Sequence, residues 1–242
     1  MSNKKNILLI SPFFYPEPIS TGKFNTKLAE GLVALGHSVT VLCFHPFYPN
    51  WKVKGSTAQL EGVEIIRGGK NLTYTKKTIL RRLILEISFA FFVIRKLGKY
   101  QKDKDIVIPI FPPSFAFYFM LPFLNKKVRK VGMVHDLQEV YSEGKGGVIN
   151  SAIRIFIHKI EKKCYQSCTK VLFLSAEMKS EAKRLYGLVE KKLEVQYPFI
   201  TLGNKVTNEL ESIFDRDKIN IVYSGALGEK QNPSALFDFF SY

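Results

Sequence analysis

Residues 6–44, NILLISPFFYPEPISTGKFNTKLAEGLVALGHSVTVLCF, decide the fold, because they contain one complete strand–helix–strand unit. NILLIS is a continuous apolar run of the kind found in strands that are covered on both faces. KFNTKLAEGLVALG has helical periodicity and ends at Gly36, a residue common just after a helix C-terminus. HSVTVLCF is a second apolar run. The stretch therefore predicts two strands of a parallel sheet joined by a crossover helix.

The same alternation continues along the chain. Further strands are expected at residues 62–69, 105–110, 128–134, 170–175 and 192–198, with helices at 79–100, from Ser114, at 148–166 and at 176–187. Strands that alternate with helices favour a sheet with helices on both faces. The predicted fold class is α/β, a doubly wound, mostly parallel, Rossmann-like sheet.

The chain is expected to divide into two parts. Residues 1–198 hold the first sheet, and the polar segment 199–217 is typical of a linker. INIVYSG then predicts a strand of a second sheet, and Ser234 is placed to cap a helix over SALFDFF. One strand and part of one helix cannot bury their apolar faces. Residues 218–242 are therefore expected to be the incomplete start of a second Rossmann-like domain.

The 242 residues include 36 Lys and Arg against 21 Asp and Glu, a net charge of +15. Such a surface attracts polyanions: nucleic acid, phosphorylated substrates or an anionic membrane leaflet. No motif with aromatic stacking positions supports nucleic-acid binding, so no nucleic-acid partner is expected. The three cysteines form no even set, which fits a reducing cytoplasm. Cys164 and Cys168 lack a CxxC motif or a neighbouring His, so buried structural thiols are expected rather than a metal site.

Residues 106–124, IVIPIFPPSFAFYFMLPFL, are uncharged and close to the length of a membrane-spanning helix. Prolines interrupt the stretch, so a buried strand, a Pro-Pro turn and a short core helix from Ser114 are expected instead. At the N-terminus, the apolar run NILLIS is too short for a signal peptide and is followed by prolines, so none is predicted.

Ligands of open parallel sheets bind outside the carboxyl ends of the strands, so the loops there are the candidate sites. The loop after the first strand lacks GxGxxG and GxxxxGKS/T, which argues against a dinucleotide cofactor or a P-loop. It ends in Ser20, Thr21 and Gly22 at a helix start. There the free backbone N–H groups either bind an anion or are satisfied by ordinary side-chain capping.

Two further loops carry candidate residues. His135 and Asp136 follow the strand at 128–134, where a histidine can contact a substrate hydroxyl, act as a base or be purely structural. Gly225 and Lys230 precede the last predicted helix. A close backbone approach at the glycine, together with one cation, suits a diphosphate.

Five segments, taken together, resemble a known family and follow its order: FFYPEPISTGKFNTKLAEGLVALGHSVTVLC, FPPS, VHDLQEVY, VLFLSAEMKSEA and IVYSGALGEKQNP. The chain resembles the retaining, two-domain (GT-B) enzymes of glycosyltransferase family 4 that build bacterial surface polysaccharides such as colanic acid and O-antigen (a lipopolysaccharide component). The resemblance implies that residues 1–198 are the acceptor-side, N-terminal half of a GT-B fold. Residues 218–242 would begin the donor-side domain, which binds the nucleotide-sugar.

This resemblance implies roles for the first and fourth loops. Ser20, Thr21 and Gly22 would lie near the donor diphosphate and the transferred sugar. His135 would line the catalytic sugar site and orient the sugar rather than serve as an obligatory base.

The resemblance also implies roles for the last loop. Lys230 would neutralise the leaving diphosphate, and Gly225 would pack against the nucleotide. Ala226 stands where the family usually has an arginine, so only one of the two usual cations is present. The implied donor is a nucleotide-diphosphate sugar. No metal or other cofactor is implied, because cationic side chains and helix termini stabilise the departing diphosphate.

The implied reaction is transfer with retention to a lipid-linked (polyprenyl diphosphate) or polymeric glycan acceptor. The segment LILEISFAFFVI, residues 83–94, is flanked by Arg81, Arg82, Arg95 and Lys96 and is too short to span a bilayer. It suits the interface of an anionic membrane surface beside the acceptor site, or else it is a core helix with solvated ends. The expected location is cytoplasmic, peripheral at the inner face of the cell membrane.

The family's donor-side domain carries two glutamates that grip the donor, and the sequence ends before either position. It is therefore expected to be a truncated transferase with little or no activity alone. One alternative is a non-catalytic, membrane-associated, acceptor-binding half that needs a separate donor domain, which a co-purifying partner would reveal. Another is a fragment of a GT-B-type sugar-nucleotide 2-epimerase, which would release a free sugar nucleotide and need no membrane face.

Overall fold

The computed structural model describes residues 4–137, 148–199, 217–223 and 232–240, with the backbone alone at 148–153. The chain separates into two units, Met1–Thr201 and Leu202–Tyr242. Each unit is described by itself, because their relative position is not determined.

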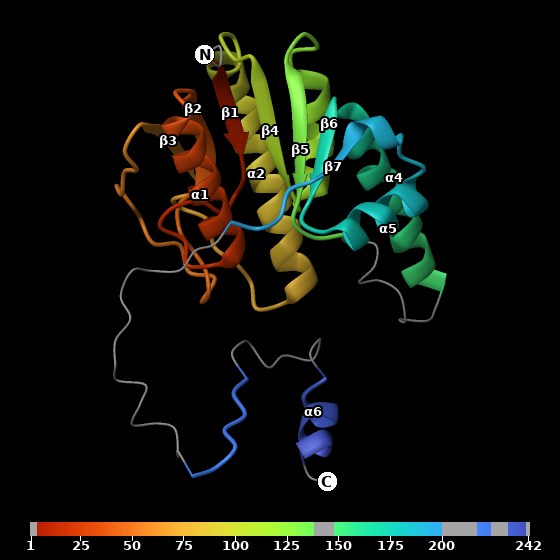
Figure 1. The fold of residues 1–242 in the computed structure, drawn as a ribbon. Coiled ribbons are helices and arrows are strands. Elements are labelled where there is room, and N and C mark those ends of the chain that lie inside the picture. Colours follow the sequence, from red (N-terminus) through yellow and green to blue (C-terminus); the bar gives the residue numbers. More distant parts are fainter. Residues whose placement is uncertain (1–3, 138–147, 200–216, 224–231, 241–242) are drawn as a thin grey trace. The chain divides into compact units, whose positions relative to one another are not determined.

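A parallel sheet forms the centre of the first unit (Figure 1). Among the described residues it has seven strands, in the spatial order β3-β2-β1-β4-β5-β6-β7, and every neighbouring pair is parallel. The strands are β1 (Asn6–Ile10), β2 (Ser38–Phe44), β3 (Val63–Gly68), β4 (Ile106–Phe111), β5 (Arg129–Val134), β6 (Lys170–Phe173) and β7 (Leu193–Val195). This arrangement confirms the predicted doubly wound α/β class.

Helices follow every strand from β3 to β6 as well as β1, whereas β2 and β3 are joined by a loop, and the helices cover both faces of the sheet (Figure 1). They are α1 (Ser20–Ala34), α2 (Thr78–Tyr100), α3 (Ser114–Met120), α4 (Val148–Ser167) and α5 (Ala176–Tyr186). Gly36 has φ +85°, which suits the glycine predicted after α1. At the start of α5, the Ser175 hydroxyl accepts a hydrogen bond from the Met178 N–H, as an N-cap should.

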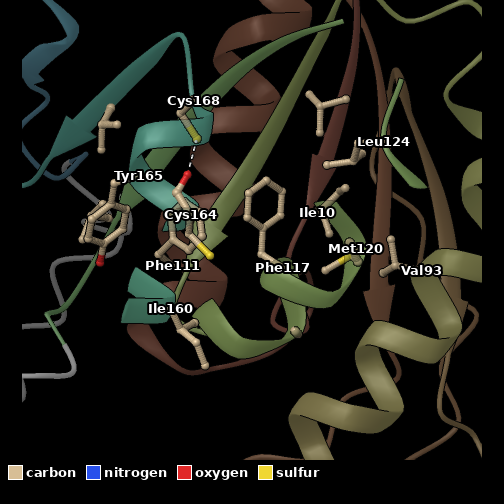
Figure 2. Packing of buried hydrophobic residues seen from close by; sticks show 14 of the residues in the cluster. Ile10, Val93, Phe111, Phe117, Met120, Leu124, Ile160, Cys164, Tyr165 and Cys168 are labelled. Atoms are coloured by element: carbon tan, nitrogen blue, oxygen red, sulfur yellow. Dashed lines mark hydrogen bonds between the residues drawn. The ribbon is translucent and has the colours of Figure 1, made fainter. Parts of the chain in front are cut away.

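Side chains of β1 and β2 alternate between two buried clusters. One cluster contains Leu8, Ile10 and Leu42 together with α2, α3 and α4 residues, and the other contains Ile7 and Leu9 together with Ala29 of α1. Figure 2 shows the first cluster, where α3 and α4 side chains pack against the sheet. Burial on both faces explains why these strands are continuously apolar in sequence.

The cysteines are free and buried, which confirms the prediction of structural thiols. The Cys164 thiol donates to the carbonyl oxygen of Ser114 at 3.2 Å, and the Cys168 thiol donates to the carbonyl oxygen of Cys164 at 3.4 Å (Figure 2). Burial raises the pKa of Cys168 to about 12. These thiols therefore stay protonated and act as small packing groups.

The uncharged stretch 106–124 forms β4 and α3, followed by a short 3₁₀ turn, η1 (Leu121–Phe123). None of the described helices is long and apolar enough to cross a membrane. Ala116, Phe117 and Met120 are buried, but Phe119 is 44% exposed and Phe123 of η1 is 54% exposed. The expected core helix is therefore only half core, because α3 lies at the surface with one face on the sheet.

In the second unit the described residues form one helix, α6 (Pro233–Phe240). Asn232 caps it, since its Oδ1 accepts from the Ala235 N–H at 3.5 Å; the predicted cap at Ser234 is wrong, because that residue already lies inside the helix. Residues 217–223 form no strand, contrary to expectation, and Ile219 is 92% exposed. A strand needs a paired neighbour for its backbone hydrogen bonds, and the described part of this unit offers none.

Candidate functional site

The candidate site lies where the carboxyl ends of β1, β2, β4 and β5 meet. The strand order reverses between β1 and β4, so the loops after these two strands leave in opposite directions. Ligands of doubly wound sheets bind in the crevice at this switch point. Here the β1–α1 loop and the loops after β2, β4 and β5 form its surroundings.

The first turn of α1 points its backbone N–H groups toward this edge. Ile19 precedes the helix in an extended conformation (φ −65°, ψ 147°), and no side chain among the described residues caps the turn. The capping alternative at Ser20 does not hold, because Ser20 is itself the first helical residue. Three N–H groups, those of Ser20, Thr21 and Gly22, precede the first helical bond, from the Lys23 N–H to the Ile19 carbonyl oxygen. They suit an anion.

Gly22 lets the helix approach the loop that precedes it. A Cβ at this position would lie 2.9 Å from the carbonyl oxygen of Glu17 and 3.0 Å from its Cβ. Both neighbours are held in place, so a larger residue has no room. The glycine that the sequence marks as part of the candidate site is therefore required by packing as well.

Glu17, in the same loop, was not identified from the sequence. It is 3% exposed, and its Oε1 accepts from the Tyr48 N–H at 2.5 Å while both oxygens accept from the Phe47 N–H at 3.2 Å. Burial raises the pKa of Glu17, although the two N–H groups and the Arg67 guanidinium oppose the rise. The carboxylate fastens the β1–α1 loop to the loop after β2.

Two more polar residues, the partly buried Arg67 and the buried Asn25, support the same loop. The Arg67 guanidinium donates to the carbonyl oxygens of Tyr15 at 2.7 Å and Ala58 at 2.9 Å. Asn25 of α1 donates from Nδ2 to Ser11 Oγ at 2.9 Å. Neither residue has a local motif that singles it out in sequence, because its partners are distant in the chain or belong to an irregular loop.

His135 lies directly after β5, as the sequence predicts. Its backbone N–H donates to the Phe111 carbonyl oxygen at 2.8 Å, which extends the pairing with β4. Its ring meets Phe24 of α1 edge-on, with centroids 6.0 Å apart. Burial lowers the pKa of His135 to about 4, so the imidazole is neutral near pH 7. Its Nε2 is buried and has no hydrogen-bond partner among the described residues.

These contacts bring two of the predicted groups together. Phe24 lies one turn beyond Ser20 on α1, so the helix start and His135 occupy the same edge of the sheet. Asp136 is partly buried beside His135. Gly225 and Lys230 lie outside the described residues, as does Ala226.

The four basic residues of α2 that flank residues 83–94 form two separate pairs rather than one cluster. The pairs are 14 residues apart on the helix, or about 20 Å at 1.5 Å per residue. The Arg81 guanidinium stacks 4.0 Å from the Trp51 ring centroid, and Arg82 Nε lies 3.3 Å from Glu86 Oε1. At the other end, Arg95 lies 6.0 Å from the Phe91 ring and Lys96 follows it.

Within the ranges that the structure describes, no group of three or more His, Cys, Asp or Glu side chains is arranged to hold a metal ion. The candidate site on this unit therefore consists of helix N–H groups, a neutral imidazole and a buried carboxylate. Such a set can bind an anion beside a hydroxyl-bearing ligand.

Comparisons with known proteins identify the family and the fold. The profile of Glycosyltransferase Family 4 matches residues 22–204. The chain is 25% identical over 252 aligned positions to the putative colanic acid biosynthesis glycosyl transferase WcaI of Escherichia coli, covering 93% of this chain and 60% of that protein. It thus spans about three fifths of the length of this curated relative.

Solved structures share the fold at low identity. The sucrose-phosphate synthase of Thermosynechococcus elongatus superposes with a TM-score of 0.56 at 15% identity, over 79% of this chain and 47% of the synthase. The catalytic domain of starch synthase IV from Arabidopsis thaliana, bound to ADP and acarbose, gives 0.56 at 12% identity, over 81% and 52% of the two chains. These matches show a fold in common, that of one half of a GT-B enzyme.

Proposed function

The chain belongs to glycosyltransferase family 4, and we propose that it takes part in transferring a sugar from a nucleotide-diphosphate donor to a glycan of a bacterial surface polysaccharide. Residues 1–198 would be its acceptor-side domain. The observation that carries the proposal is the pairing of an uncapped helix start with a neutral His135, whose Nε2 is buried, at the switch point of the sheet. The colanic acid transferase of E. coli supports the polysaccharide class.

In this proposal the N–H groups of Ser20, Thr21 and Gly22 face the donor diphosphate and the transferred sugar. A helix start stabilises negative charge through its unpaired N–H groups and its dipole. Glu17 acts as a positioning residue, because it holds the loop from which these groups project. Gly225 against the nucleotide and Lys230 on the leaving diphosphate complete the proposed donor contacts.

His135 would orient the transferred sugar. A neutral imidazole can donate or accept one hydrogen bond at Nε2, the atom that is buried without a partner among the described residues. The acceptor hydroxyl would attack the anomeric carbon on the face that the diphosphate leaves, which gives retention. The departing phosphate oxygen would take the hydroxyl proton, so a pKa near 4 is compatible with the role of His135.

The acceptor in this proposal is a lipid-linked glycan, such as a polyprenyl-diphosphate sugar, or a growing polymer. A lipid-linked acceptor requires the protein to work at the membrane. The two cationic pairs of α2 and the apolar residues between them support a peripheral position on the anionic inner face.

A transfer assay tests the proposal. The purified chain, with a donor-side domain of the family supplied separately, is incubated with labelled nucleotide-sugars and with membranes that carry polyprenyl-diphosphate-linked glycans, and label is measured in the lipid fraction. We expect transfer with retention, seen by NMR of the product, and a rate roughly 100-fold lower for His135→Ala.

His37→Ala is the matched control, since His37 precedes β2 at the opposite edge of the sheet. Equal rates for the two variants would show that His135 has no role in the transfer. If the label stays in the nucleotide-sugar under all conditions, the proposed reaction is wrong.

A further inference from the structure

An apolar surface runs along α2 and continues onto α3 and α4. On α2, Ile79 is 85% exposed and Phe91 is 65% exposed. Phe119 of α3 and Phe156 of α4 are 44% and 55% exposed. Three neighbouring helices thus expose large apolar side chains, since α3 packs against both α2 and α4. An apolar patch of this kind on a folded unit marks an interaction surface.

The surface is hollowed into two adjacent grooves. The first, of about 340 Å³, lies between α2 and α3 and is lined entirely by apolar residues: Ile87, Ala90, Phe91, Ile94, Phe119 and Phe123, with Phe115 at its end. The second, of about 360 Å³, lies between α2, α3 and α4, and its lining includes Ile79, Leu83, Phe115, Phe156 and Ile160. Phe115 separates the two, with its ring centroid 4.7 Å from Phe119 and 5.9 Å from Phe156.

The lining specifies the chemistry of the occupant. In the second groove the ionisable groups are Arg82 and Glu86, which pair with each other at 3.3 Å. Glu86 also accepts from the Ala116 N–H at 3.1 Å and is 5% exposed, so it serves the packing of α2 on α3. A groove with so few polar atoms favours a hydrocarbon chain over a sugar or a peptide backbone, whose polar groups would stay unpaired.

The charges around the grooves specify what the hydrocarbon belongs to. α2 contains five basic residues and one acidic residue, the buried Glu86. Arg82 stands at one end of the surface, and Arg95 and Lys96 line a hollow of about 750 Å³ at the other. A second copy of this chain is a poor partner, because either relative orientation of two α2 helices sets cations against cations. An anionic lipid surface complements both the ends and the middle.

We propose that the face formed by α2, α3 and α4 docks on an anionic lipid bilayer, with acyl chains entering the two grooves beside Phe119 and Phe156. We call this surface the lipid face. The inference rests on the proposed function, because a protein that acts on a membrane-borne acceptor has to be held at the bilayer. It adds α3 and α4 to the membrane-contacting surface, since the charge pattern in the sequence identifies only α2.

Vesicle flotation tests the lipid face directly. The full chain is mixed with vesicles of phosphatidylcholine, with or without phosphatidylglycerol, in the absence of nucleotide-sugar and acceptor. We expect flotation with the anionic vesicles and at least a roughly tenfold weaker apparent affinity for Phe119→Ser/Phe156→Ser. The matched control is Leu35→Ser/Val189→Ser, whose residues are 68% and 55% exposed on other elements. Circular dichroism shows whether each variant is folded.

The depth of insertion distinguishes binding in which the lipid face enters the acyl-chain region from binding by electrostatic attraction alone. Trp51 is the single tryptophan of the chain, so Trp51→Phe/Phe119→Trp places the one fluorophore in a groove, and Trp51→Phe/Leu35→Trp places it elsewhere. Vesicles with bromine on the acyl chains should quench the first protein and leave the second unchanged.

Several outcomes would overturn the inference: no flotation, equal loss in the two serine variants, equal quenching at positions 119 and 35, or a dimer in ultracentrifugation that Phe119→Ser/Phe156→Ser dissociates. The vesicles hold no glycan or donor. A chain that floats and inserts but transfers no sugar even when a donor-side domain is supplied would therefore retain its lipid face while refuting the proposed reaction.

Discussion

The imidazole of His135, whose Nε2 is buried, makes the stability of the first unit depend on pH in a predictable direction. Burial lowers its pKa from an ordinary value near 6.5 to about 4. Between these values the unfolded chain binds a proton that the folded chain does not, so acid favours unfolding. The contribution of the neutral imidazole is complete above pH 6.5 and is lost as the pH falls toward 4.

The size of this effect follows from the shift. A difference of about 2.5 pH units, at 1.36 kcal/mol per unit, predicts a loss of about 3 kcal/mol in the free energy of unfolding between pH 7.5 and pH 4. Glu17 and Glu86 act in the opposite sense, because burial raises the pKa of both carboxyls and acid then favours the folded state. A comparison with His135→Gln cancels these shared terms, since the variant lacks only the imidazole.

Urea unfolding at several pH values measures the difference. Trp51 fluorescence reports on the first unit, because it is the single tryptophan in the chain. We expect the wild-type curve to fall relative to that of His135→Gln by about 3 kcal/mol across this range. NMR titration of the His135 ring should show a midpoint near 4. Parallel stability curves, together with a midpoint near 6.5, would refute the argument that burial desolvates the ring.

Three further expectations concern packing within the first unit. Gly22→Ala should destabilise the chain by about 1–3 kcal/mol in urea unfolding, because its Cβ would lie 2.9 Å from a backbone oxygen; Gly31→Ala, with nothing within 4 Å, should instead stabilise it by about 0.5–1 kcal/mol. Glu17→Ala should cost about 1–3 kcal/mol, since two loop N–H groups lose their acceptor, and a neutral result would contradict the role given to it. A thiol reagent should leave Cys43 and Cys168 unmodified in the native chain at pH 8, because burial raises both pKa values to about 12, and should label them in urea; fast native labelling would contradict their burial.

The elements of the first unit could be predicted because their signals are local. Strands that are covered on both faces are apolar throughout, and a helix that is covered on one face shows the 3.6-residue period. The start of α1 was placed at Lys23, three residues late. Ile19, the residue before the helix, is not a capping type, so the sequence gives no signal at the true boundary.

The exposed face of α3 was missed for a different reason. SFAFYFM is apolar on every side, so its period cannot tell a buried face from a free one. Residues 219–223, the described part of the strand expected at 219–225, have the apolar, β-branched composition of a strand, yet the described residues of their unit provide no neighbour to pair with. Composition expresses a propensity, whereas a sheet requires a partner.

The positions of the candidate site residues could be predicted from the sequence, but their contacts could not. The order of strands and helices is enough to place His135 and the start of α1 at carboxyl ends of strands, because all strands of a doubly wound sheet run the same way. What these groups can do depends on contacts between distant segments. Burial keeps the imidazole neutral and Phe24 meets it edge-on, while Glu17 ties the helix start to the N–H groups of Phe47 and Tyr48. A buried carboxylate in an irregular loop has no pattern of its own, so its role follows only from the N–H groups that fold around it.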